Sequence, residues 1–303
     1  KLTSIASLDL HFIHEKGSGP NPIPIILSHG WPGSIIEFEH LIGPLTQPEK
    51  FGGSIKDSFD IVIPSLPGFG FSSAPNRPMG LRGMARIFNT LMTDVLGYKN
   101  YLAQGGYWGG AISSWLGYDH FKLCNGIHIN ILTMRNRGEL LTQEERDWAI
   151  KFDSEQIMEN GYRTQQATKP QTLGYAMLDS PVGTAAWIIE KFYSWSDTRE
   201  KNLDEIFGKD KLLTNIMIYL VTGSMNTASW IYYGRREEGG RILSSNGSRV
   251  EVPCAMALFP QEMLAWPPRS YVDRLYNATQ WTEMPRGGHF GASLGVVELT
   301  VAL

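Results

Sequence analysis

The sequence has 303 residues, of which 42% are hydrophobic and 11% aromatic, and a formal net charge of −3. A chain of this length and composition can bury a large core. Its mild acidity argues against the basic surface of a nucleic-acid-binding protein, so no nucleic acid partner is expected. The two cysteines, Cys124 and Cys254, lie in apolar runs and predict buried thiols rather than a disulfide framework.

Targeting and metal-binding signals are missing from the sequence. No apolar run approaches the roughly 20 residues that span a bilayer, and no signal peptide is visible. We therefore expect a soluble, cytoplasmic protein without a membrane span. Histidines outside the motifs described below show no recurring ligand spacing, so neither a metal nor a cofactor is predicted. These histidines are His11, His14, His40, His120 and His128.

Short apolar runs alternate with helical patterns along much of the chain. Such alternation predicts a mostly parallel sheet with helices on both faces. In chain order, strands are expected at residues 7–14, 23–28, 59–64, 100–104, 126–130, 252–259 and 280–284.

The pattern becomes almost wholly helical between residues 132 and 245. Thr142 to Glu145 has the spacing of a capping box and predicts a helix start there. The α/β pattern resumes at residue 252. We therefore predict an α/β core formed by residues 1–131 and 246–303, with an inserted helical lid at residues 132–245.

A glycine-rich corner lies between the strand at 100–104 and a helix predicted at 108–118. It reads Gly-Gly-Tyr-Trp-Gly-Gly from Gly105 to Gly110. Glycines permit the sharp strand-to-helix turn that lifts one side chain above a sheet, as in a nucleophile elbow. Tyr107 is that side chain.

Three further segments accompany this corner. The loop from His29 to Ser34 follows a strand, and its backbone amides could stabilise an oxyanion, with His29 bracing the loop rather than acting as a base. Glu262 follows the strand at 252–259, and His289 lies on a Gly-Gly loop after the last strand. An oxyanion loop, an elbow, an acid and then a histidine is the chain order of α/β-hydrolases.

On these motifs the sequence resembles the epoxide hydrolases of the microsomal and juvenile-hormone type, over essentially its whole length. The matching strings include HGWPGS at 29–34, IPSLPGFGFS at 63–72, QGGYWGG at 104–110, FPQEM at 259–263 and MPRGGHF at 284–290. Longer matches cover 168–192 and 212–223. The resemblance implies an α/β-hydrolase core with a helical lid, and an aspartate at the position that Tyr107 occupies here.

The resemblance also implies roles for other residues. Glu262 would orient His289 as general base, and the lid tyrosines Tyr162 and Tyr232 would donate hydrogen bonds to the epoxide oxygen, with Tyr233 as the alternative register. The backbone amides of Trp31 and Trp108 would form the oxyanion site. Trp187 and Trp230 are expected to line a pocket for a bulky apolar substrate.

A tyrosine at the elbow changes the chemistry. An aspartate would attack an epoxide carbon to give an ester, which water then hydrolyses. A phenol would give an aryl ether, which has no carbonyl for water to attack. The ordinary route to a diol is therefore expected to be impaired.

Three functions remain open for this sequence. The chain could bind and open an apolar epoxide with the diol route impaired, or it could be a repurposed cyclase with Tyr162 and Tyr232 as acids and His289 with Glu262 as base. It could also be a non-catalytic protein that binds an apolar ligand. The partner expected is a small, apolar, epoxide-like substrate, and a homodimer stays open.

Two points on the origin of the chain are also open. Tyr107 is either a natural change or an introduced substitution. The resemblance implies an additional N-terminal meander around the lid. Since the sequence begins inside a strand pattern without an initiator methionine, we expect that this segment has been trimmed or processed.

Overall fold

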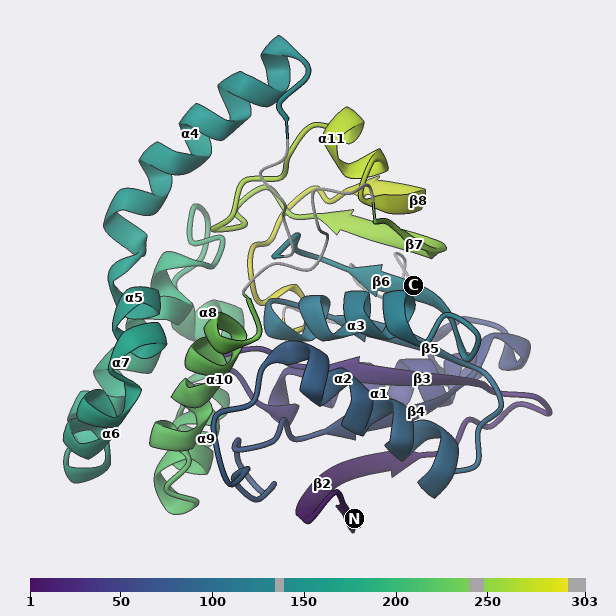
Figure 1. The fold of residues 1–303 in the computed structure, drawn as a ribbon. Coiled ribbons are helices and arrows are strands. Elements are labelled where there is room, and N and C mark those ends of the chain that lie inside the picture. Colours follow the sequence, from purple (N-terminus) through teal and green to yellow (C-terminus); the bar gives the residue numbers. More distant parts are fainter. Residues whose placement is uncertain (134–138, 240–247, 294–303) are drawn as a thin grey trace.

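In the computed structural model, residues 1–133, 139–239 and 248–293 are described, and they form an α/β fold with an eight-stranded sheet (Figure 1). The strand order is β1-β2-β4-β3-β5-β6-β7-β8. Pairing is parallel from β4 through β3 to β8 and antiparallel at β1 and β2. The strands are β1 (Leu2–Ile5), β2 (Leu8–Glu15), β3 (Ile23–Ser28), β4 (Phe59–Pro64), β5 (Tyr101–Gly105), β6 (Cys124–Ile129), β7 (Val250–Leu258) and β8 (Tyr276–Glu283).

The predicted α/β class and mostly parallel sheet are confirmed. The helices are α1 (Glu39–Thr46), α2 (Leu81–Thr90), α3 (Trp108–Asp119), α4 (Gln143–Glu159), α5 (Gly161–Thr168), α6 (Pro170–Asp179), α7 (Pro181–Ser194), α8 (Leu203–Phe207), α9 (Lys209–Val221), α10 (Met225–Glu237) and α11 (Arg269–Asp273). None of the described helices is long and apolar enough to cross a membrane.

The two faces of the central strands bury different sets of side chains. Ile26 and Val62 belong to the larger cluster, which also contains residues of α2 and α3. Their neighbours Ile25 and Ile61 belong to a second cluster with Leu41 of α1. Successive side chains on a strand point to opposite faces, so near-continuous apolar strands indicate a sheet covered on both sides.

The first expected strand, at residues 7–14, is β2 shifted by one residue, and the sequence did not predict β1 before it. The two strands form a hairpin in which Ile5 pairs with Leu8. The two residues between them, Ala6 and Ser7, have φ values of 51° and 64°. Positive φ at both central residues is the geometry of the tight turns that suit the twist of paired strands.

All the described elements between β6 and β7 are helices, α4 to α10, and we call this segment the helical insertion. Figure 1 shows it beyond the arrowheads of the parallel strands. Thr142 caps α4 as predicted, with Oγ1 accepting from the Glu145 amide at 3.2 Å. The Glu145 carboxylate does not complete the capping box, because it accepts from the Leu141 amide and pairs with Arg274 of the core at 2.7 Å.

Both cysteines are buried free thiols, Cys124 in β6 and Cys254 in β7. The exact limits predicted for the core and the lid stay predictions, because residues 134–138 and 240–247 lie outside the described part of the chain.

Candidate active site

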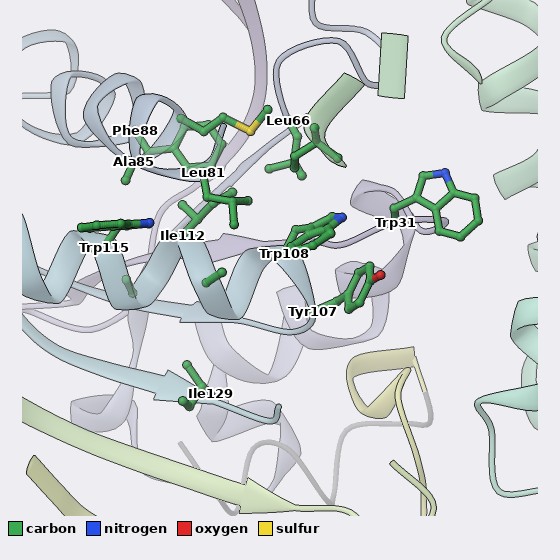
Figure 2. Packing of buried hydrophobic residues seen from close by; sticks show 14 of the residues in the cluster. Trp31, Leu66, Leu81, Ala85, Phe88, Tyr107, Trp108, Ile112, Trp115 and Ile129 are labelled. Atoms are coloured by element: carbon green, nitrogen blue, oxygen red, sulfur yellow. The ribbon is translucent and has the colours of Figure 1, made fainter. Parts of the chain in front are cut away.

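The turn between β5 and α3 has the geometry of an elbow. Tyr107 has φ 47° and ψ −116°, a conformation that is rare for a bulky residue. A Cβ atom on Gly109 would lie 1.7 Å from the carbonyl oxygen of Ser28, so only glycine allows α3 to begin this close to β3. Figure 2 shows Tyr107 at the start of α3 with its hydroxyl directed away from the helix. Strained positions of this kind cluster at functional sites.

Three phenol groups meet at this elbow. The hydroxyl oxygen of Tyr107 lies 2.5 Å from that of Tyr162 in α5 and 2.9 Å from that of Tyr232 in α10. All three side chains are buried. Burial raises the pKa of Tyr107 to about 12 and raises the pKa values of Tyr162 and Tyr232 well above the ordinary value. All three groups are therefore protonated at neutral pH, and the Tyr107 oxygen can accept a hydrogen bond from either neighbour.

A histidine and a carboxylate lie beside the phenols. Nδ1 of His289 is 2.8 Å from Oε1 of Glu262, and both side chains are buried. A carboxylate can only accept, so Nδ1–H donates and Nε2 carries the free lone pair. Nε2 has no hydrogen-bond partner among the described residues. The His289 ring centroid lies 4.8 Å from that of Tyr107, which places the imidazole next to the elbow side chain.

The loop after β3 contacts the elbow directly. A Cβ atom on Gly30 would lie 2.6 Å from the Cβ atom of Tyr107. His29 braces the loop, because Nε2 accepts from the Leu66 amide at 3.2 Å and Nδ1 lies 2.9 Å from the Gly30 carbonyl oxygen. Burial lowers the pKa of His29 to about 4, so it is neutral. The loop and the start of α3 thus bring Trp31 and Trp108 to either side of Tyr107 (Figure 2).

Two side chains of the helical insertion hold this loop. Nδ2 of Asn215 donates to the Pro32 carbonyl at 2.8 Å, and the hydroxyl of Tyr219 donates to the Gly33 carbonyl at 2.7 Å. Both residues belong to α9. The loop conformation therefore depends on the insertion as well as on the core.

Aromatic rings enclose the three phenols. The Trp31 ring stacks on Tyr162 with a centroid distance of 5.3 Å and an interplanar angle of 8°. The ring centroid of Trp108 lies 4.6 Å from that of Tyr107 and 4.9 Å from that of Tyr232. The three phenol rings are thus enclosed largely by other aromatic rings.

Sequence reasoning missed Trp195, which lies just after α7. The centroid of its ring lies 5.8 Å from that of Tyr107, 5.1 Å from that of Tyr162 and 4.9 Å from that of His289. Its carbonyl oxygen also accepts from the His289 amide at 2.9 Å. A weak signal for it was its place at helical spacing after the apolar residues Ile188 and Phe192.

The two tryptophans expected to line the pocket are not brought to the phenols. Trp187 is half-buried, and its Nε1 donates to Gln166 at 3.3 Å. Trp230 is half-buried on α10, and residues two apart on a helix do not share a face, so its side chain points away from that of Tyr232. Within α10 it is the hydroxyl of Tyr232, rather than that of Tyr233, that reaches Tyr107.

The sheet, the elbow and the histidine–carboxylate pair define the class of protein. Residues 23–230 match the model of the alpha/beta hydrolase fold. Residues 2–38 match the model of the epoxide hydrolase N terminus. The chain belongs to the epoxide hydrolase family of this fold.

Individual relatives agree with this assignment. The chain is 36% identical to epoxide hydrolase 1 of Oryctolagus cuniculus over 96% of this chain and 70% of that protein. It is 37% identical to juvenile hormone epoxide hydrolase 2 of Ctenocephalides felis over 96% of this chain and 67% of that protein. The chain spans 65% of the length of a curated relative from Stigmatella aurantiaca.

Solved structures of epoxide hydrolases share the fold of this chain. The juvenile hormone epoxide hydrolase of the silkworm Bombyx mori aligns with a TM-score of 0.83 and 32% identity, over 97% of this chain and 74% of that chain. The Aspergillus niger epoxide hydrolase aligns with a TM-score of 0.82 and 28% identity, over 99% of this chain and 76% of that chain.

Proposed function

We propose that this chain binds and opens an apolar epoxide at the site around Tyr107, and that the ester route to a diol is impaired because Tyr107 replaces the nucleophile. The observation that supports this proposal most directly is the position of the Tyr107 hydroxyl between those of Tyr162 and Tyr232. Two phenol hydroxyls that can each donate a hydrogen bond converge there on one oxygen atom. An epoxide oxygen has the same acceptor character, so the phenol occupies a subsite suited to the substrate oxygen.

Tyr162 and Tyr232 are proposed as the acids. As the epoxide carbon–oxygen bond breaks, negative charge develops on the departing oxygen, and a phenol can stabilise it or give it a proton. Their raised pKa values keep both hydroxyls protonated before the reaction. For an epoxide to use them, the ring of Tyr107 must first leave this position.

His289 and Glu262 are proposed as the base and its orienting acid. In the ester route, Nε2 of His289 takes a proton from water, which attacks the ester carbonyl, and the released alkoxide becomes the second hydroxyl of the diol. The backbone amides of Trp31 and Trp108 would stabilise the oxyanion formed in that step. Residues 132–245 would act as a lid that excludes water from the first step.

Tyr107 interrupts this cycle at two points. With a pKa raised to about 12 by burial, its hydroxyl gives almost no phenoxide at neutral pH. If it did attack an epoxide carbon, the new bond would be an aryl ether without a carbonyl group. The protein would then be alkylated once and could not turn over.

A second function is favoured by the free lone pair on Nε2 of His289. If the substrate carries its own hydroxyl, His289 can remove that proton, and the alkoxide can attack the epoxide carbon within the same molecule. The broken carbon–oxygen bond leaves an oxygen that Tyr162 protonates. The product is a cyclic ether, and no enzyme-bound intermediate is formed.

The test compares the chain with its Tyr107→Asp variant on a panel of aryl and alkyl epoxides in isotopically labelled water. Tyr107→Asn is the matched control, because it has the same size as aspartate without a carboxylate nucleophile. We expect no diol from the unaltered chain or from Tyr107→Asn, and diol from Tyr107→Asp. In a single turnover the diol from Tyr107→Asp should be unlabelled, because its new oxygen comes from the aspartate.

Other outcomes have distinct meanings. An unlabelled cyclic product from the unaltered chain would identify the internal attack. Binding without turnover by the unaltered chain and by Tyr107→Asp would identify a ligand-binding protein. Labelled diol from the unaltered chain would contradict the proposal, because water would then attack the epoxide directly.

A further inference from the structure

Lys191 is a buried cation beside the proposed acid. It lies on α7, and its side chain is only 6% exposed. It shares the buried side of the helix with Thr184 and Ile188, and Trp195, just after the helix, continues the same spacing. Lysine is almost never buried unless its charge is compensated, so its surroundings need an account.

Two carboxylates compensate the charge from the solvent side. Nζ of Lys191 lies 2.7 Å from Oε1 of Glu190 and 3.5 Å from Oε2 of Glu159. The side chains of Glu190 and Glu159 are 55% and 31% exposed. Oε2 of Glu159 also accepts from Nε1 of Trp195 at 3.0 Å. Lys191, Glu159 and Trp195 thus form one connected group.

Two aromatic rings contact the cation from the site. Nζ lies 4.9 Å from the ring centroid of Tyr162 and 5.6 Å from that of Trp195. A cation within about 6 Å of a ring centroid is attracted by the negative face of the ring. The ring of Tyr162 is the one whose hydroxyl binds Tyr107, and the Trp195 ring contacts His289.

We propose that Lys191 is a positioning residue that fixes the ring of Tyr162 and stabilises the negative charge that Tyr162 acquires when it gives its proton to the opening epoxide. The inference rests on the proposed function, in which Tyr162 is an acid. A positive charge 4.9 Å from the ring centroid of a buried phenoxide lowers the energy of that phenoxide.

The carboxylate of Glu159 allows the effect of the Lys191 charge to be separated from the effect of its packing. Glu159 opposes negative charge on Tyr162. Replacing Lys191 by methionine, which has a similar length, removes the cation that pairs with Glu159, so that the carboxylate acts more strongly against negative charge on Tyr162. Removing both charges in Glu159→Gln/Lys191→Met should undo part of the defect, whereas a lost packing contact would not be recovered. Both carboxylates reach solvent, so neither variant leaves a fully buried unpaired charge.

The chemical test uses the Tyr107→Asp background and measures ester formation and ester hydrolysis separately in single turnovers. We expect Lys191→Met to slow ester formation about tenfold, the rate equivalent of one cation–π contact, and to leave ester hydrolysis unchanged. Lys191→Arg should stay near the parent rate, and the double variant should lie between. Lys209→Met, which removes an exposed lysine of α9, is the matched control and should have no effect.

A second measurement uses the unaltered chain and needs no turnover. With carbon-13 at the phenolic carbon of tyrosine, the Tyr162 resonance is assigned by its loss in Tyr162→Phe. It should shift in Lys191→Met and in the double variant, and it should stay in place in Lys191→Arg and Lys209→Met. The double variant replaces Lys191→Met if that single variant does not fold.

Failure of the inference is distinct from failure of the proposed function. If Tyr107→Asp forms no ester, the proposed function fails, and the nuclear magnetic resonance measurement alone decides whether Lys191 acts on Tyr162. If ester forms, two results for Lys191→Met overturn the inference. One is that ester formation and ester hydrolysis slow equally, and the other is that neither step slows. An unmoved Tyr162 resonance also overturns it.

Discussion

The hydroxyl oxygens of Tyr107 and Tyr162 lie 2.5 Å apart, and this contact joins the core to the helical insertion at the centre of the site. Tyr107 comes from the turn between β5 and α3, whereas Tyr162 comes from α5. Any ligand oxygen that binds Tyr162 must therefore replace the phenol. The elbow side chain competes with the substrate for the proposed acids.

The same contact predicts a loss of stability in Tyr107→Phe. The ring is kept, but the hydroxyls of Tyr162 and Tyr232 lose their shared buried partner, which costs about 1–3 kcal/mol. Urea unfolding measures the change, with Tyr175→Phe on the exposed surface of α6 as control. Equal midpoints for the two variants would show that the hydrogen bonds at Tyr107 contribute nothing.

The His289–Glu262 pair predicts a second result. His289→Ala removes the base and Glu262→Gln removes the charge that orients it, so each should lower any turnover of the chain and of Tyr107→Asp by about 10²- to 10⁴-fold. Glu283→Gln, at the end of β8, is the control and should retain the parent rate. Unchanged rates in both site variants would mean that the pair no longer takes part in the reaction.

Buried histidines predict a dependence of stability on pH. His128 in β6 is buried, neither ring nitrogen has a partner among the described residues, and burial lowers its pKa from 6.5 to about 4. Between these values the unfolded chain binds more protons, so the stability from neutral His128 is complete above pH 6.5 and is lost as the pH falls to 4. The loss is about 3 kcal/mol.

Unfolding free energies between pH 4 and 7 test this dependence. Replacement by leucine in His128→Leu should flatten the profile. His29, with a pKa also lowered to about 4, should leave a second contribution of the same sign. The exposed His40→Leu is the control. A profile unchanged by His128→Leu would show that this histidine is already protonated in the folded chain or is accessible to water.

Much of the fold could be predicted because apolar strands and glycine corners are local signals. The strand at 59–64 was predicted to the residue, and Trp108 was predicted as the first residue of its helix. The start of β8 was placed four residues late, since Tyr276–Glu283 is an edge strand with many polar residues. Polar edge strands lack the apolar run that marks central ones.

The site was less accessible to sequence reasoning where it depends on tertiary contacts. The proximity of Tyr107, Tyr162 and Tyr232 matches what the resemblance implied, although their roles remain proposals. Trp195 and Lys191 went unnoticed, because a tryptophan or a lysine on an apolar helix gives no sign of which residues it meets. Only the packing of α5 and α7 beside the elbow brings them to the acid.

The most direct test of the central claim is intact-mass spectrometry of Tyr107→Asp/His289→Ala after incubation with an epoxide. The introduced carboxylate should attack the epoxide, and without the base the ester should persist, so the mass should rise by that of one epoxide. Tyr107→Asn/His289→Ala should show no increase. A folded Tyr107→Asp/His289→Ala protein that binds the epoxide but gains no mass would contradict the assignment of Tyr107 to the nucleophile position.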